Sequence, residues 1–454
     1  MRRFTFVARL GVGDNAAISL VQRDSTVIEV QFIGAYQRLE YGVGSALDFL
    51  KAHDLKPSEV AVDLMILAAL LNAADTRVSR VRNSQNGWTR EIDLVVPVSD
   101  PTLWTAQAGA LGEMLRFLTG DYWRIFFRQR PSSLNQIAPT PTRLPLQHFD
   151  EVCLFSGGLD SLIGAIDLIA GGRKPLLVSH WYDGETSKAQ KAVWSKLEGR
   201  YSNVGVKVMR TRLGFDRYQV QTGEIENTQR GRSFVFFALA ALAASALTGN
   251  VRIVVPENGY IGLNVPLDPL RLGALSTRTT HPHYLAMFNA LLDRLGIAAT
   301  LDNPYRHKTK GEMVEECAEM ALLKATVPLS MSCSSPAKAR YRGLSPRHCG
   351  TCVPCLIRRA ALKKGLSTND PTLYLVPDLE VGRLDTTRAE GEHIRSFELM
   401  IARLSANPAC ASALARIPGP LNDEPAELND FVEVFRRGIL EVGELLDGVE
   451  AGPG

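Results

Sequence analysis

The chain lacks any hydrophobic run long enough to cross a membrane. Its longest apolar stretch, 234–247, falls short of the roughly 20 residues that a spanning helix needs, and its many alanines predict a buried helix instead. The apolar run 4–10 is too short for a secretory leader, and Thr5 and Arg9 interrupt it. We therefore expect a cytoplasmic protein with no membrane partner.

A large excess of either charge is also absent. The chain contains 51 Lys and Arg against 48 Asp and Glu, which gives a formal net charge of +3. A dedicated RNA-binding enzyme more often carries an obvious basic stripe, so direct binding of nucleic acid is not expected. For the one local basic segment, a solvated face is favoured over a partner contact. This segment contains Arg77, Arg80, Arg82, Asn83 and Arg90.

Cysteine is scarce, and its distribution excludes a disulfide framework, because four of the seven cysteines are clustered. Consecutive thiolates two residues apart can close on one tetrahedral ion, and four thiolates leave no open coordination position. The cluster therefore predicts structural zinc rather than catalytic zinc, with an iron–sulfur cluster as the alternative. Its members are Cys333, Cys349, Cys352 and Cys355.

A strand-to-helix turn at residues 152–161 organises the chain. Four apolar residues end in Ser-Gly-Gly, and an amphipathic helix pattern begins at once. Glycines let an oxyanion approach the backbone N–H groups, and the first helical turn adds further donors. No Gly-Lys-Ser/Thr follows, so this is not a Walker loop; a turn without a ligand is the alternative. The predicted phosphate ligands are Ser156, Gly157, Gly158, Leu159, Asp160 and Ser161.

From residue 152 onward, strand and helix patterns alternate, which predicts a parallel sheet with helices on both faces. Ligands of such sheets lie beyond the carboxyl ends of the strands. His180 follows the second predicted strand, 175–179, and is a candidate for the adenosine site or a structural histidine. Glu257 follows the predicted strand 251–255, where it could hold Mg²⁺ or the activated group, or belong to a plain turn.

Several charged residues at predicted helix starts suggest anion binding. Arg230 and Arg232 open the alanine-rich helix, where a cation opposes the helix dipole unless an anion lies nearby. Lys310 begins another helix and is either a phosphate-neutralising residue or a solvated lysine. Asp160 is assigned to Mg²⁺ or to orienting the loop. Asp160, Lys310 and Glu257 are thus the predicted catalytic residues.

Length and a hydrophobic content of 45% predict a soluble protein of two or three domains. Residues 1–145 are expected to form an α+β domain that binds a partner, with strands at 5–10, 26–32, 92–98 and 122–127 and helices at 43–51, 60–72 and 104–117. Prolines punctuate a linker at 129–147. Residues 146–377 form the loop-bearing domain, and residues 378–454 are a helical region, with helices at 392–404 and 428–446.

Together these motifs resemble the 7-cyano-7-deazaguanine synthase (QueC) family of PP-loop ATP pyrophosphatases, over about residues 150–365. The resemblance rests on the Ser-Gly-Gly-Leu-Asp-Ser loop, on Thr309-Lys310-x-Glu312, and on Ser332-Cys333 followed by His348-Cys349-Gly350-x-Cys352-x2-Cys355-x2-Arg358. It implies a PP-loop fold, ATP and Mg²⁺ as cofactors, and structural zinc on the four cysteines. It also implies adenylation of 7-carboxy-7-deazaguanine, followed by addition of ammonia.

The chain departs from that family in its extra N-terminal region, its long C-terminal region and the segments 180–184 and 257–259. Its layout is similar to QueC-like proteins of bacterial anti-phage loci, the QatC group. This implies a defence role beside an ATPase, a small QatB-like partner protein and a TatD-like nuclease. The acceptor stays open between ammonia and a partner protein's amine. Alternative functions are a nucleotide-binding scaffold without turnover and a PP-loop tRNA-modifying enzyme.

Overall fold

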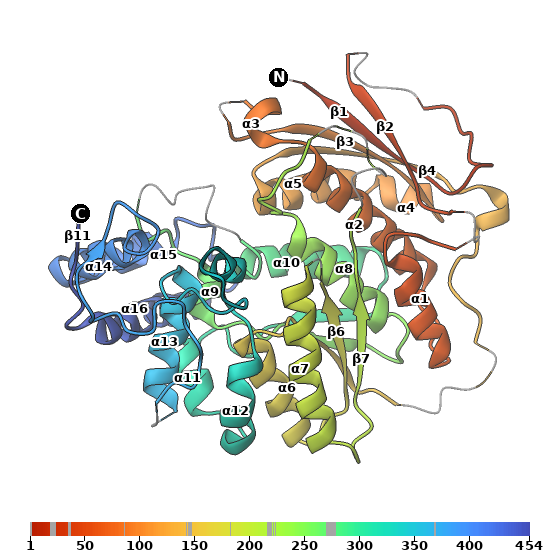
Figure 1. Cartoon of the computed structure of the whole chain (residues 1–454). Coiled ribbons are helices and arrows are strands. Elements are labelled where there is room, and N and C mark those ends of the chain that lie inside the picture. The colour runs from red at the N-terminus through yellow and green to blue at the C-terminus, as the bar shows by residue number, and fades with distance from the viewer. Residues whose placement is uncertain are drawn as a thin grey trace.

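The computed structural model describes residues 2–18, 24–34, 38–85, 87–141, 143, 148–181, 183–215, 220, 222, 224–268, 278–366 and 369–454. Part of the proline-punctuated linker, 144–147, lies outside these residues. Two parallel sheets lie on either side of a layer of helices (Figure 1). The C-terminal helices, blue in Figure 1, pack beside the second sheet. None of the described helices is both long and apolar enough to span a membrane.

The N-terminal sheet has the order β2-β1-β3-β4, and all its strands are parallel. The predicted α+β arrangement is therefore wrong: this region is α/β, because helices cross over between the strands. The single helix expected at 104–117 is two helices, since Asp100 caps a separate helix that starts at Pro101. The elements are β1 (Phe4–Arg9), β2 (Thr26–Gln31), α1 (Val43–Ala52), α2 (Glu59–Arg77), α3 (Arg80–Asn83), β3 (Glu91–Val98), α4 (Pro101–Thr105), α5 (Ala108–Thr119) and β4 (Tyr122–Gln129).

The second sheet confirms the predicted parallel sheet, with the order β7-β6-β5-β8-β9. Both faces are covered, because alternate residues of β5 enter different cores: Leu154 packs with α8, and Cys153 packs with α6. The elements are β5 (Glu151–Leu154), α6 (Leu159–Ala170), β6 (Pro175–His180), α7 (Gly184–Arg200), β7 (Lys207–Thr211), α8 (Arg232–Ala244), β8 (Val251–Val254), α9 (Gly259–Leu263), α10 (Pro282–Arg294) and β9 (Ala299–Asp302).

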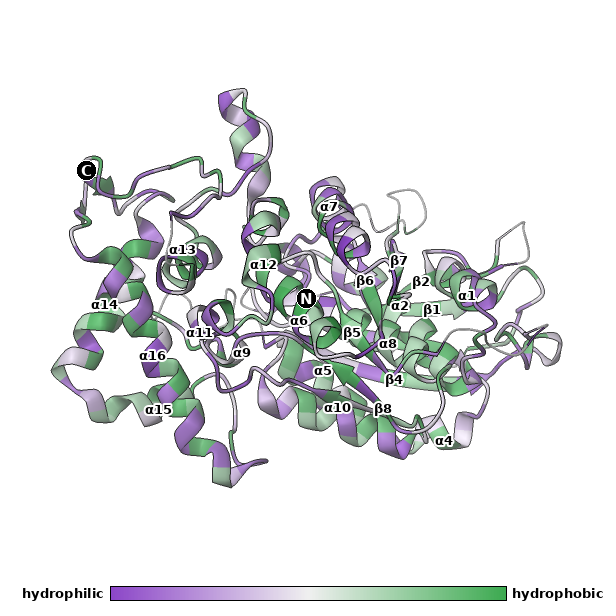
Figure 2. Ribbon diagram, turned by 90° about the horizontal axis from the view of Figure 1, so that it is seen from below, coloured by the Kyte–Doolittle hydropathy of each residue, from purple (hydrophilic) through white to green (hydrophobic). Residues whose placement is uncertain are grey.

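The two sheets share one hydrophobic core. Helix α8 packs on β5, β6 and β8 with one side and on α2 with the other. Buried side chains of both regions, among them Phe6, Leu71, Leu154 and Phe237, belong to one continuous cluster. Figure 2 shows α8 as largely hydrophobic, which agrees with its central position. The N-terminal region is therefore packed directly against the loop-bearing sheet.

The C-terminal region is helical, as expected, and α16 has the predicted bounds. It packs on α9, α13, α14 and α15 around a separate core. The elements are α11 (Lys310–Glu315), α12 (Met320–Thr326), α13 (Val353–Gly365), β10 (Leu384–Asp385), α14 (Glu392–Ala406), α15 (Ala411–Ala415), α16 (Leu428–Leu446) and β11 (Ala451–Gly452). Short 3₁₀ turns lie at η1 (Ser132–Leu134), η3 (Val327–Leu329), η4 (Pro336–Arg342), η5 (Pro408–Cys410) and η6 (Pro425–Glu427).

Candidate nucleotide site

The predicted phosphate loop is a tight turn between β5 and α6. Gly157 has a φ of +84°, and a Cβ there would lie 2.9 Å from the Gln190 side chain, so the turn requires glycine. Gly158 has extended backbone and room for a Cβ, whose nearest neighbour would be Ser156 Oγ at 3.4 Å. The turn geometry therefore depends on Gly157, whereas Gly158 leaves open space beside the first turn of α6.

Hydroxyl groups bond the loop's N–H groups. Ser161 Oγ accepts from Gly157 N (3.1 Å), and Ser156 Oγ accepts from Gly158 N (3.3 Å). Ser332 Oγ, which comes from a distant segment, lies 3.4 Å from Leu159 N. The backbone N–H groups of Gly157, Gly158 and Leu159 are donors of the kind that bind a phosphate oxygen. The loop thus has the donor set of an anion site.

Asp160, Glu257 and Lys310 come together beside the loop. Lys310 Nζ lies 3.0 Å from Asp160 Oδ1, and both side chains are more than nine-tenths buried. Asn258 donates its side-chain amide to Asp160 Oδ2 at 2.7 Å, and its backbone N–H lies 3.3 Å from the same oxygen. Glu257 lines the same cavity as Asp160 and Lys310, so all three predicted catalytic residues are neighbours, although each comes from a different part of the chain.

The two buried carboxyl groups have opposite pKa shifts. Burial, the Asp160 carboxylate and a hydrogen bond to it raise the pKa of Glu257 well above its usual value. Burial alone would raise the pKa of Asp160, but Lys310 and hydrogen bonds from Glu257 and Asn258 hold that pKa below its usual value. Of the two, Asp160 is therefore the group that carries the negative charge more readily, and burial disfavours a second charge on Glu257. With both oxygens facing protein groups, Asp160 is suited to orienting the loop.

Lys310 is held in place by the C-terminal region. It is the first residue of α11, whose start has a capping box between Thr309 and Glu312. Glu441, buried on α16, accepts from the Thr309 hydroxyl and from Gly311 N at 3.2 Å. Lys364 lies 2.9 Å from the same carboxylate. A carboxylate at the N-terminus of α11 also stabilises the helix dipole.

His180 ends β6 and is fully enclosed. Its Nδ1 lies 3.4 Å from Leu213 N, and Gln190 donates to its carbonyl oxygen at 3.0 Å. Burial and the positive charge of Arg232 lower the pKa of His180 to about 3, so its ring is neutral. His180 lines a cavity of about 190 Å³ between β7 and α2. The burial of His180 supports the structural interpretation, and its role in an adenosine site stays a prediction.

The two arginines at the start of α8 have different surroundings. Arg232 lines two cavities that adjoin Ser156 of the loop. Arg230 does not reach the loop, which corrects its predicted role: it stacks on Trp88 at 4.2 Å and donates to Thr119 O at 3.1 Å. Burial lowers the pKa of Arg230 to about 10. Its partner is the N-terminal region rather than a nucleotide.

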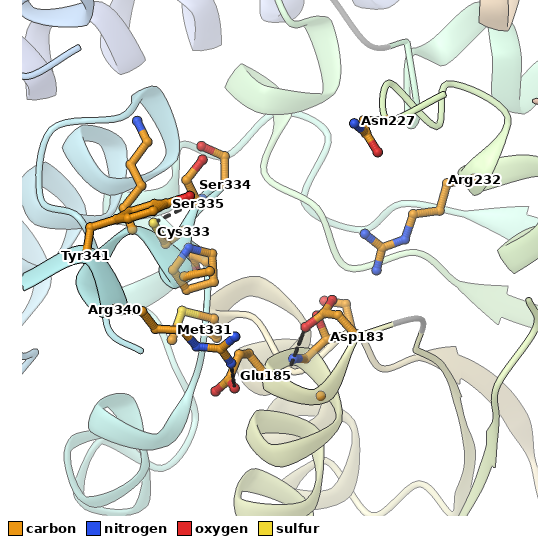
Figure 3. Close-up of a pocket in the computed structure, with 17 residues that line it drawn as sticks. Asp183, Glu185, Asn227, Arg232, Met331, Cys333, Ser334, Ser335, Arg340 and Tyr341 are labelled. Atoms are coloured by element: carbon orange, nitrogen blue, oxygen red, sulfur yellow. Dashed lines mark hydrogen bonds and ion pairs between the residues drawn. The ribbon is translucent and has the colours of Figure 1, made fainter. Parts of the chain in front are cut away.

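Three cavities meet at Ser156. The largest, about 1130 Å³, runs between α7 and the segment 331–341, with Asn227 and Arg232 on its far side (Figure 3). The second, about 280 Å³, contains Phe236 and Phe237 and lies between β5 and β8, where the strand order reverses. The third, about 240 Å³, contains Asp160, Glu257 and Lys310. Open parallel sheets bind their ligands at such a reversal point.

The four clustered cysteines form a site that fits zinc. Their Sγ atoms all lie within 4.8 Å of one another, and two pairs, Cys333 with Cys352 and Cys349 with Cys355, are 3.9 Å apart. A tetrahedral site with Zn–S bonds of about 2.3 Å needs sulfurs ~3.8 Å apart. Backbone N–H groups also approach two of the sulfurs at 3.3 Å. The donor set is that of a closed structural site.

The cysteine element also shapes the loop's cavity. Ser332, next to Cys333, is the residue that meets Leu159 N. The backbone N–H of Ser332 donates to His348 Nε2 at 3.1 Å, and the buried Arg358 lies 3.3 Å from the Ser332 hydroxyl. A metal bound to the cysteines would therefore fix the segment that closes over the loop.

These observations define an α/β protein with parallel sheets, a loop suited to anions and a cysteine cluster suited to zinc. Comparison with models of known protein families and with curated proteins found no match. Glu441 was predicted only as part of an acidic tail that packs or binds a partner, and its contact with the start of α11 was not predicted. Glu441 lies on the apolar face of α16, three residues after Gly438 and one before Val442.

Proposed function

We propose that this protein is a QueC-like, ATP-dependent ligase that adenylates a carboxylic acid and transfers the acyl group to an amine. The observation that carries the proposal is the Asp160–Glu257–Lys310 cluster beside an anion-type loop, at the carboxyl ends of parallel strands. On the resemblance described above, the acid is 7-carboxy-7-deazaguanine.

In this reaction an oxygen of the acid attacks the α-phosphorus of ATP, and pyrophosphate leaves as the acyl adenylate forms. The amine nitrogen then attacks the acyl carbon, AMP leaves, and the amine loses a proton. The N–H groups of Gly157, Gly158 and Leu159 would bind phosphate oxygens in place of the hydroxyls. Lys310 and Arg232 would offset the negative charge near the phosphates. The enzyme contributes mainly positioning and charge neutralisation.

On the resemblance, Mg²⁺ would bind beside the loop, where Glu257 offers a carboxyl group, and when bound it would neutralise phosphate charge. Because the pKa of Glu257 is raised, Mg²⁺ binding there would favour loss of its proton, since Mg²⁺ prefers charged oxygen ligands. The zinc at the four cysteines would have no open position for substrate and would serve structure alone.

ATP–pyrophosphate exchange by zinc-loaded protein tests the proposal. We expect exchange that depends on 7-carboxy-7-deazaguanine and that is lost in the Asp160→Ala variant. A Glu315→Ala variant, altered at the exposed end of α11, is the matched control and should keep exchange. Exchange that ignores the acid would contradict an adenylating ligase with this substrate.

The acceptor amine is either ammonia or an amine of a QatB-like partner protein. The outer cavity, about 1130 Å³, adjoins Ser156 of the loop, and the acceptor would enter there. Intact mass of a co-expressed partner shows directly whether that protein is the acceptor. An unchanged partner mass during ATP turnover would leave ammonia as the acceptor. Loss of phage protection in the Asp160→Ala variant would connect the chemistry to defence.

A nucleotide-binding scaffold is the second candidate. It is favoured by one feature: Asp160 already has Lys310 and Asn258 as partners, so the charged cluster is satisfied without a reacting acid. ATP binding without exchange, together with full protection by a correctly folded Asp160→Ala variant, would support the scaffold over the ligase.

A further inference from the structure

The segment 224–232 joins the N-terminal region to the largest cavity. Two of its side chains, Asn227 and Arg232, line that cavity opposite Ser334 and Ser335, as Figure 3 shows. Residues 224–229 have no helical or strand structure of their own. Their position must therefore come from contacts with other parts of the protein.

Those contacts come from the N-terminal region, chiefly from the end of α2 and from α3. Glu226 N donates to Thr76 O at 3.0 Å, and the Glu226 carboxylate accepts from Arg80 N at 2.7 Å. Thr228 Oγ1 accepts from Arg80 Nε at 3.2 Å. Burial would raise the pKa of Glu226, but its hydrogen bonds from Arg80 and Thr228 lower it, so the carboxylate is charged.

Asp75 holds the next residues. Its Oδ2 accepts from Gly231 N at 2.8 Å, so a side chain of α2 bonds the N-cap residue of α8, directly before Arg232. A Cβ at Gly231 would lie 2.5 Å from Leu71, which shows how closely the two helices approach. Asp75 is itself bound to Arg90 at 2.5 Å. A fixed carboxylate thus determines where α8 begins.

We infer that the N-terminal region forms part of the nucleotide site, with Glu226 and Asp75 as positioning residues that set Arg232 against the phosphates. This rests on the proposed function, because it assigns the phosphates of ATP to Arg232. The presence of the N-terminal region, residues 1–145, can therefore be explained without the predicted partner-binding role. Its buried contacts with the segment 224–232 supply a function inside the chain.

A double-mutant cycle on ATP binding tests the inference. Calorimetry would measure Mg²⁺–ATP affinity for the wild type, Glu226→Ala, Arg232→Ala and the double variant, all zinc-loaded. Glu91→Ala is the control, because Glu91 pairs with Arg3 at 2.7 Å in the same region but away from this segment. Hydrogen exchange of residues 226–235 in the same proteins reports the position of the segment without any ligand.

Glu226→Ala should weaken ATP binding about tenfold, and the double variant should match Arg232→Ala, because residues that act through one another are not additive. Glu226→Gln, which keeps one acceptor oxygen, should have an ATP affinity between those of the wild type and Glu226→Ala. Exchange at 226–235 should accelerate in Glu226→Ala and stay unchanged in Glu91→Ala.

Fully additive effects, or unchanged ATP affinity in Glu226→Ala, would overturn the inference while the proposed function stands. Failure of the wild type to bind ATP would overturn both.

Discussion

A buried cluster of charges beneath the N-terminal sheet offers a quantitative test of the structure. Asp121 accepts from Arg80 at 2.6 and 2.8 Å and from the Arg90 side chain at 2.7 and 3.2 Å. All of these side chains are at least 97% buried. Asp121→Asn keeps the shape of the side chain but leaves two guanidinium groups with Asp75 as their one remaining carboxylate in the described cluster.

Breaking a buried ion pair by removing one partner costs about 3–5 kcal/mol, because the other charge stays buried. At 1.36 kcal/mol per factor of ten, this cost corresponds to about a 10²- to 10⁴-fold loss of protection of the backbone amides against hydrogen exchange. Hydrogen exchange of peptides from β3 and β4 would measure that loss. Asp48→Asn is the matched control, because Asp48 pairs with Arg38 at 3.1 Å with side-chain exposures of 61% and 49%. We expect the control to cost no more than about 1 kcal/mol.

The pH dependence has a defined sign. Burial would raise the pKa of Asp121, but Arg90 and Arg80 lower it below the usual value of 3.8. The stabilisation is therefore fully present above the usual pKa and is lost as the pH falls through the lowered one. Hydrogen-exchange protection in Asp121→Asn equal to that of the wild type would contradict this prediction. It would mean that the buried Arg80 and Arg90 charges do not require the Asp121 carboxylate.

Three further predictions concern the loop, the metal and the lysine. Gly157→Ala should destabilise the protein by about 1–3 kcal/mol because Gly157 has a φ of +84°. Gly158→Ala should have the same unfolding free energy as the wild type but lose ATP affinity in calorimetry. Equal unfolding free energies of the two variants would contradict this prediction. Cys352→Ser should lose most of the single zinc per chain in elemental analysis, and Cys410→Ser should keep it. Lys310→Met should lower ATP–pyrophosphate exchange about 10²- to 10³-fold, and an undiminished rate would exclude a role in charge neutralisation.

The features that sequence predicted best have local causes. The loop follows from glycines between an apolar strand and a helix, and the cysteine cluster follows from short spacings. Glu257 and Lys310 lie close to Asp160, because the ends of parallel strands and the starts of the following helices lie at the same edge of the sheet.

The errors arose where distant segments decide the outcome. Whether the strands of the N-terminal sheet are parallel depends on which strands pair with one another. The alternation of apolar residues along a strand does not indicate its pairing partner. The position of Arg230 was misjudged because Trp88 and Thr119, more than 100 residues away, hold its side chain. Helix-dipole reasoning indicated that an arginine there needs a partner, but it could not distinguish a ligand from an aromatic ring and a carbonyl oxygen.

The contact between Glu441 and the start of α11 has a consequence for synthesis of the chain on the ribosome. Lys310 precedes Glu441 by 131 residues (441 − 310), which at ~5–20 residues per second takes about 7–26 s to translate. During that interval a nascent chain carries the finished loop but lacks the carboxylate that holds α11. The ordered arrangement of the loop and Lys310 is therefore expected to form late in translation. A product truncated before α16 should contain the loop without an ordered lysine beside it.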